Sequence, residues 1–241
     1  MAGGERLLRV GSALPDPPFE TPGPPPAGLD VDWMRAVAAE LGARYELVHY
    51  DGGDFEGIFA GLGERYDVVA SGATVTDHRR ALARWCRPYL RSGQSLVVDT
   101  ARTPHVHGTG DLTGLVLGVQ QGNTSEPVAR RLHAEGRVAD VRVYPYEGIL
   151  GALDDLQAGR IGGFMKLEPV LRQLTADRPP LAVVQTGITV ELIAVAVASG
   201  DATLAAEIDR AQDALRARGT LAELGARWLA DSDPAATAVC P

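Results

Sequence analysis

Lysine is almost absent from this chain. Lysine and arginine together number 23 in 241 residues, and Lys166 is the only lysine among them. Arginine keeps its proton, whereas a lysine in a partly desolvated site can release it, form a Schiff base or pair as a compact charge with a ligand anion. We therefore treat Lys166 as a candidate functional residue. The alternative is that one lysine survived by chance in an arginine-rich sequence.

Cysteines and long apolar runs are also scarce. The two cysteines, Cys86 and Cys240, are too few for a disulfide framework and lack the spacing of metal ligands. We expect Cys86 to be a buried apolar residue and Cys240 to lie in a passive tail. The longest apolar stretch covers only residues 193–198, and a membrane-spanning helix needs about 20 residues. This excludes membrane insertion.

An excess of positive charge is missing as well. Acidic residues outnumber basic ones by 31 to 23, and no basic cluster is interleaved with aromatic residues, so we expect no nucleic acid partner. The sequence offers no Ser/His/Asp triad, glycine-rich phosphate loop or metal-ligand cluster, so we expect neither cofactor nor metal. Residues 1–6 lead into the first apolar run without an export signal. As written, the chain is expected to be cytoplasmic, or extracytoplasmic if a leader preceded Met1.

Short apolar runs alternate with amphipathic helical stretches. The pattern predicts strands at 7–10, 45–50 and 67–70 and helices at 33–41, 55–62 and 79–84. It restarts after residue 100, with strands at 115–119, 141–144 and 162–166, helices at 126–133 and 149–158, a strand at 193–197, and helices at 202–218 and 220–229. This βαβ rhythm indicates an α/β fold with parallel strands, two similar lobes, a double crossing between them and a cleft at their junction.

One turn between a predicted strand and helix has the composition of an anion site. Residues 70–80 read ASGATVTDHRR and leave an apolar strand through small and hydroxyl residues. Backbone N–H groups, the Thr74 hydroxyl and the Arg79 guanidinium could converge there on a carboxylate. The alternative is that the hydroxyl residues only cap the following helix.

The chain resembles the family 3 extracellular solute-binding proteins of the amino-acid-binding type over nearly its whole length. The resemblance rests on residues 8–11, 17–20, 28–32, 66–76, 88–89, 111–112, 118–124, 158–160 and 219–220, and on Trp228. It implies the type II periplasmic-binding-protein architecture, in which two Rossmann-like α/β lobes are joined by a two-strand hinge. Lobe 1 would comprise residues 1–94 and 191–241, lobe 2 residues 95–190, with the ligand cleft between them.

The resemblance also implies roles for individual residues. Arg79 would bind a ligand carboxylate, with lobe 1 contacts from Gly72 and Thr74 and with Phe55 packing on the ligand. For Phe55 the alternative is a place in the helix core. Lobe 2 would reach the same carboxylate from a helix start, for which a plain helix cap is the alternative. The residues at that helix start are Asn123, Thr124 and Ser125.

The family's ammonium-binding acids are missing. Relatives hold the ligand ammonium with two acidic groups, and Ala13 and Leu167 stand at the matching positions. Lys166 lies beside Leu167, and strand alternation predicts that only one of the two points straight into the cleft. Asp16 is the remaining counter-charge. Because a poorly paired buried cation costs several kcal/mol, we expect a ligand with a carboxylate and little need for a cation site, such as a hydroxy, keto or cyclic acid.

Two functions follow from the resemblance. The first is a monomeric binding protein that traps a small carboxylate for ABC-type uptake or sensing, with a transporter permease as partner. The second is a lyase similar to the cyclohexadienyl dehydratases, which use the same fold. In that enzyme Arg79 would hold the carboxylate while a proton moved through Lys166, Glu168 or Asp16. Fold alone does not choose between them; we favour the binding protein.

Overall fold

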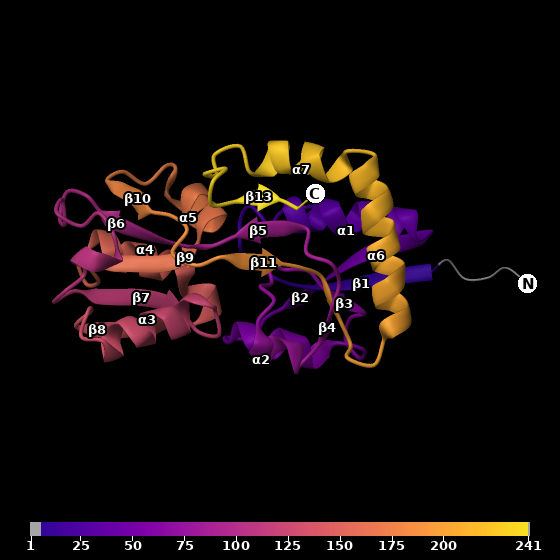
Figure 1. The fold of residues 1–241 in the computed structure, drawn as a ribbon, viewed down its shortest axis with the longest axis horizontal. Helices are drawn as coiled ribbons and strands as arrows, with labels where there is room; N and C mark the ends of the chain where they lie inside the picture. Colours follow the sequence, from indigo (N-terminus) through magenta and orange to yellow (C-terminus); the bar gives the residue numbers. More distant parts are fainter. Residues whose placement is uncertain (1–5, 241) are drawn as a thin grey trace, which may run out of the picture.

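Two five-stranded β-sheets, each packed against helices and joined by crossing strands, form the frame of the protein (Figure 1). The computed structural model describes residues 6–240. The first sheet has the order β2 (Ala43–Tyr50), β1 (Arg6–Ala13), β3 (Val68–Val69), β12 (Ala196–Val197) and β4 (Arg84–Trp85). Strands β1, β2 and β3 are parallel, as the βαβ rhythm predicts, and β12 is antiparallel to its neighbours.

The second sheet repeats this plan. Its order is β10 (Leu181–Gln185), β6 (Gln94–Asp99), β9 (Gly163–Leu167), β7 (Val116–Gln120) and β8 (Asp140–Tyr144). Strands β7, β8 and β9 are parallel, whereas β6 and β10 are antiparallel additions. The predicted α/β class is confirmed. We propose that each sheet is the centre of one lobe; the boundaries at 94/95 and 190/191 stay a prediction, and residues 1–5 and 241 lie outside the described residues.

Helices connect the strands. Those of the first half are α1 (Leu29–Glu40), η1 (Phe55–Gly61) and α2 (Asp77–Arg80), and those of the second are η2 (Thr109–Asp111), α3 (Ser125–Ala134), η3 (Tyr146–Gly148), α4 (Ile149–Gln157) and α5 (Glu168–Thr175). The apolar periodicity does not predict η2, η3 and α5. Toward the C-terminus follow α6 (Ala202–Ala217) and α7 (Thr220–Trp228), which pack on α1. Two predictions need correction. The helix expected at 79–84 ends at Arg80, and the segment 55–62 forms a tighter 3₁₀ helix.

A small third sheet links the two halves. It consists of β11 (Glu191–Ile193), β5 (Leu90–Ser92) and β13 (Ala238–Val239), all antiparallel. Strand β5 continues into β6 of the second sheet, and β11 continues into β12 of the first, so the chain crosses twice (Figure 1). The strand predicted at 193–197 is therefore two short strands. The C-terminal segment is not a passive tail, since β13 pairs with β5.

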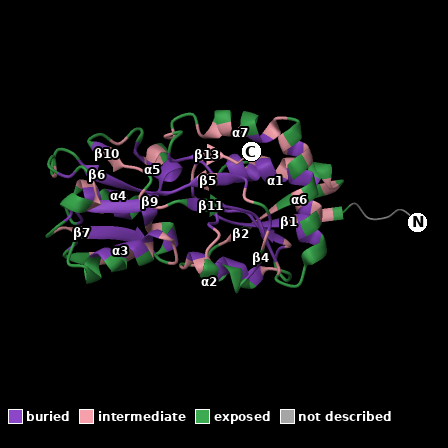
Figure 2. Ribbon diagram, viewed as in Figure 1, coloured by how far each residue is buried: buried purple, intermediate pink, exposed green. Residues whose placement is uncertain are grey.

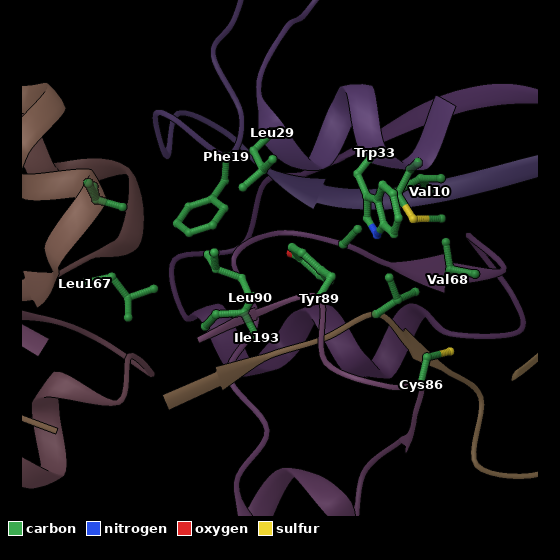
Figure 3. Close-up of a cluster of buried hydrophobic side chains, with 14 of the residues drawn as sticks. Val10, Phe19, Leu29, Trp33, Val68, Cys86, Tyr89, Leu90, Leu167 and Ile193 are labelled. Carbon is green, nitrogen blue, oxygen red and sulfur yellow. The ribbon is translucent and has the colours of Figure 1, made fainter. Parts of the chain in front are cut away.

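The core continues from one half to the other. The inner strands, such as β6 and β9, are buried along their length, whereas the edge strands β2 and β8 are only partly buried and the outer faces of the helices are exposed (Figure 2). The largest hydrophobic cluster includes Trp33 of α1, Phe19 and Ile193 in the first half and Leu167 in the second. Figure 3 shows Leu167 reaching from the second half toward Phe19, Leu90 and Ile193. Apolar contact thus supports the junction at which the predicted cleft lies.

Candidate functional site

A small, nearly filled cavity of about 10 Å³ lies between the two halves at their junction. Most of its walls are loops that leave the carboxyl ends of parallel strands, where α/β proteins place their ligands. The lining residues are Asp16, Phe55, Ser71, Gly72, Thr74 and Arg79 from the first half, and Gln94, Asn123, Thr124, Lys166 and Leu167 from the second. The structure therefore brings most of the predicted site residues together; their contacts with a ligand stay predictions.

Arg79 is a buried cation at the cavity wall. Helix α2 presents it after Thr76, whose hydroxyl accepts the Arg79 backbone N–H at 3.1 Å. The guanidinium donates to Thr74 O at 3.1 Å, to Gly122 O at 2.8 Å and, weakly, to Glu56 Oε1 at 3.5 Å. A guanidinium has five N–H groups, so two remain for a ligand. The side chain is only 3% exposed.

Two aromatic rings flank this guanidinium. Its central carbon lies 5.0 Å from the ring centre of Phe55 and 5.6 Å from that of Phe59. Burial lowers the pKa of Arg79, and the carboxylates of Glu56 and Glu191 oppose that change. The rings exclude water and fix the plane of the fork, which favours a planar anion such as a carboxylate.

Lys166 forms an ion pair across the junction. Its Nζ lies 2.9 Å from Asp16 Oδ1, and the two side chains are 3% and 5% exposed. Asp16 follows β1 of the first sheet, whereas Lys166 belongs to β9 of the second. The ammonium also lies 5.1 Å from the ring centre of Tyr146. Burial raises the pKa of Asp16, and the charge of Lys166 counteracts this shift. Asp16 is the predicted counter-charge, but its partner is a side chain of the protein.

Both Lys166 and Leu167 line the cavity, and which of the two points straight into it stays a prediction. Leu167 is the last residue of β9 and directly precedes α5. Its neighbour across the sheet is Gln94, itself a lining residue. The position that relatives fill with an ammonium-binding acid is therefore apolar and packs on the core.

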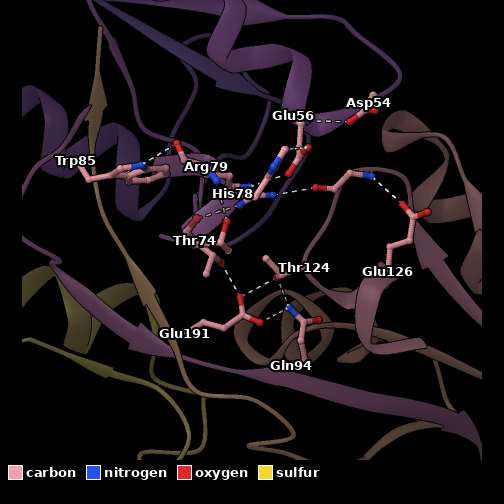
Figure 4. A network of polar contacts seen from close by, with 12 residues as sticks. Asp54, Glu56, Thr74, His78, Arg79, Trp85, Gln94, Thr124, Glu126 and Glu191 are labelled. Atoms are coloured by element: carbon pink, nitrogen blue, oxygen red, sulfur yellow. Dashed lines mark hydrogen bonds and ion pairs between the residues drawn. The ribbon is translucent and has the colours of Figure 1, made fainter. Parts of the chain in front are cut away.

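Glu191 is the site residue that sequence reasoning missed. Its Oε2 accepts hydroxyl hydrogen bonds from Thr74 at 2.6 Å and Thr124 at 2.8 Å (Figure 4). Its Oε1 accepts from Gln94 Nε2 at 3.0 Å and from Thr189 Oγ1 at 2.8 Å. The two hydroxyls predicted for a ligand carboxylate thus hold a carboxylate of the protein. The only signal in the sequence is an acid at the start of an otherwise apolar strand.

Two predicted residues lie outside the cavity. Ser125 is fully buried as the first residue of α3, and its hydroxyl has no hydrogen-bond partner among residues 6–240. Glu168 is fully buried in α5 and accepts from Arg172 Nε at 3.0 Å, Asp233 N at 2.9 Å and Thr237 Oγ1 at 2.8 Å. It anchors the C-terminal segment and does not face the cavity.

Two further buried carboxyls lie behind the lobe 1 wall. Asp30 accepts the backbone N–H of Gly72 at 2.7 Å and the Tyr89 hydroxyl at 2.6 Å, so that Gly72 N–H is not free for a ligand. Burial raises the pKa of Asp30 to about 6. Burial and the neighbouring charges of Asp30 and Asp16 hold the pKa of Glu20 well above its ordinary value.

Neither a metal cluster nor a membrane span accompanies the cavity. Within residues 6–240, no three His, Cys, Asp or Glu side chains are arranged to hold a metal ion. In the same part of the chain, no helix has the length and apolar character of a membrane span.

Comparison with known proteins identifies the family. The profile of the bacterial extracellular solute-binding proteins, family 3, matches residues 8–231. The chain belongs to this family. It is 30% identical over 227 residues to the L-arginine-binding protein of Pseudomonas aeruginosa, in a match that covers 89% of this chain and 85% of the relative. An ancestral arginine-binding protein, solved with arginine bound, superposes with a TM-score of 0.83 at 27% identity over 92% of this chain and 97% of that one.

These likenesses confirm the type II periplasmic-binding-protein fold. They also include a partial match to an enzyme of the family. The cyclohexadienyl dehydratase of Pseudomonas aeruginosa is 31% identical over 122 residues, 49% of this chain and 43% of the enzyme. The match to binding proteins is longer. The family consists of extracellular solute-binding proteins and includes the amino-acid-binding components of ABC transporters.

Proposed function

We propose that this family member traps a small carboxylate between its two lobes and, as a monomer, delivers it to an ABC transporter permease. The observation that carries the proposal is Arg79. It is a buried cation with two N–H groups left over, it lies on the cavity wall, and its contact with Glu56 is long. A carboxylate is the anion whose two oxygens match two guanidinium N–H groups.

The acids of the site support a ligand without an ammonium group. Asp16 is paired with Lys166, and Glu191 is surrounded by four hydrogen-bond donors. An incoming ammonium would have to displace Lys166 or share these acids, and a buried cation without a counter-charge is costly. A hydroxy, keto or cyclic acid meets no such obstacle.

The same contacts argue against turnover. Glu168 lies outside the cavity, and the charges of Lys166 and Asp16 are paired with each other, not with a substrate. We therefore propose a carrier.

Isothermal titration calorimetry on protein freed of ligand by unfolding and refolding tests this function. The panel contains lactate, pyruvate, shikimate and prephenate, together with arginine, histidine and cystine. At least one of the four acids is expected to bind and to remain chemically unchanged by mass spectrometry. Tight binding of the amino acids with no binding of the acids would contradict the ligand class.

A matched pair of variants assigns the anchor. Arg79→Ala is expected to weaken binding of the acid at least 100-fold, because it removes a charge-assisted pair in a buried place. Arg80→Ala removes the neighbouring arginine of the same short helix, which is exposed, and is expected to leave affinity within about twofold. Equal losses in both variants would show that general positive charge, and not the Arg79 contact, attracts the ligand.

A further inference from the structure

Glu191 begins a crossing strand and is a buried acid. It opens β11, pairs with Ser92 of β5, and is 5% exposed. An ionised carboxylate removed from water needs strong compensation by charge or hydrogen bonds. Its four donors are all neutral: three hydroxyls and one amide. The four distances of 2.6–3.0 Å are those of well-formed hydrogen bonds.

The donors come from both halves of the molecule. Thr74 follows β3 of the first sheet, whereas Thr124 follows β7 of the second and directly precedes α3. Both hydroxyls donate to the same oxygen, Oε2 of Glu191 (Figure 4). Separation of the two halves would pull at least one hydroxyl away from this oxygen, and the carboxylate would lose a donor.

Two other polar contacts close the same junction. Asp16 and Lys166 form the buried ion pair, and Arg79 Nη2 donates to the Gly122 carbonyl at 2.8 Å. Each of these links one group of the first half to one group of the second. Glu191 differs because it belongs to a crossing strand, and its Oε2 accepts one hydrogen bond from each half.

We propose that Glu191 is a positioning residue that holds the two lobes closed without a ligand. Its carboxylate fills the place between the two threonine hydroxyls, and it fixes three lining groups of the cavity: Thr74, Thr124 and Gln94. The lobes then need no ligand carboxylate at these hydroxyls in order to close. A ligand uses the Arg79 fork instead. The contact is made by groups of the protein itself, so its test does not depend on the identity of the ligand.

Small-angle X-ray scattering of the ligand-free protein measures closure directly. The wild-type curve is expected to match the closed structure. Glu191→Ala is expected to give a larger radius of gyration and a curve that fits separated lobes. The matched control Glu223→Ala removes an exposed carboxylate from α7 and should leave the curve unchanged. A wild-type curve that already fits an open molecule, or an E191A curve identical to the wild type, would overturn the proposal.

Two milder variants guard against a folding defect in E191A. Thr124→Val keeps the shape of the side chain and removes only the hydroxyl on the second half, and Glu191→Gln removes only the charge. Each is expected to shift the scattering curve in the same direction as E191A while its far-ultraviolet circular dichroism stays that of the wild type. A fall in melting temperature with an unchanged closed curve in both variants would assign Glu191 a structural role only, and would contradict the proposal. Absence of acid binding in calorimetry would instead count against the proposed function alone.

Discussion

Single residues decide the charge of this site. Arg79, Lys166, Asp16 and Glu191 bring two positive and two negative charges to the junction, all on nearly fully buried side chains. Of these two cations, Lys166 has a carboxylate as its close partner, whereas the contact of Arg79 with Glu56 is long. The charge of the sole lysine is therefore paired within the protein, through a compact ammonium that lies against Asp16.

The Lys166–Asp16 pair gives the first prediction at this scale. Lys166→Met leaves Asp16 buried without its counter-charge and is expected to lower the free energy of unfolding by about 3–5 kcal/mol. Combining Asp16→Asn with Lys166→Met makes both positions neutral and should restore most of the loss. Urea unfolding of the wild type, both single variants and the double variant measures this coupling. Additive effects of the two substitutions would show that the pair does not interact energetically.

Glu20 gives a prediction of pH dependence. Its folded-state pKa lies well above its ordinary value, so folding takes up a proton, and stability falls as pH rises from about 4 toward the folded pKa. If the folded state binds one more proton than the unfolded state, the free energy of unfolding falls by about 1.4 kcal/mol for each pH unit of increase. Glu20→Gln cannot titrate. Its stability advantage over the wild type is expected to grow as pH rises from about 4 toward the folded-state pKa of Glu20.

Urea unfolding at about pH 5, 6 and 7 measures this difference. The control is Glu223→Gln, an exposed carboxyl on α7, which should track the wild type at every pH. A constant difference between E20Q and the wild type would mean that Glu20 does not take up a proton on folding.

At the scale of elements, the C-terminal strand supports the hinge. Strand β13 pairs with β5, the Cys240 N–H donates to Tyr89 O at 2.8 Å, and Thr237 donates to the buried carboxylate of Glu168. Deletion of residues 237–241 would leave that carboxylate oxygen without its donor. We expect the free energy of unfolding to fall by about 2–3 kcal/mol. Deletion of residue 241 alone is the control, and equal urea midpoints for the two truncations would contradict this role.

Local patterns predict most elements but not the hinge. The parallel strands and long helices carry clear periodicity, and they lie within a few residues of where it predicts them. Strand β6 carries no such pattern, because its buried positions include Gln94, Ser95 and Asp99. Those polar groups have partners that are distant in sequence, among them Glu191 and the Lys166 carbonyl. The local sequence around β6 does not indicate such distant partners, so the strand cannot be predicted from it.

The candidate site shows the same limit. The resemblance assigns Arg79, Thr74, Thr124 and Lys166 to one cleft, and the structure brings them together at one cavity. The resemblance gives no indication that the Thr74 and Thr124 hydroxyls donate to Glu191, because Glu191 lies 117 positions from Thr74 in the sequence. Glu168 is a catalytic candidate in the sequence because it lies close to Lys166, but the turn into α5 directs it to the C-terminal segment.

At the scale of the whole molecule, polar contacts and a shared apolar cluster hold two α/β halves around a small cavity. Closure and ligand binding are separate properties in this account. The hinge acid and the ion pair close the lobes, and Arg79 anchors the ligand. A variant that opens the free protein should therefore still bind the acid, with affinity reduced only by the fraction of molecules that are closed.

A crystal structure of the protein with an acid found by calorimetry tests the central claim most directly. The account predicts a ligand carboxylate within hydrogen-bond distance of two Arg79 N–H groups, with the Lys166–Asp16 ion pair intact. A ligand ammonium bound to Asp16, with Lys166 displaced from it, would contradict the account.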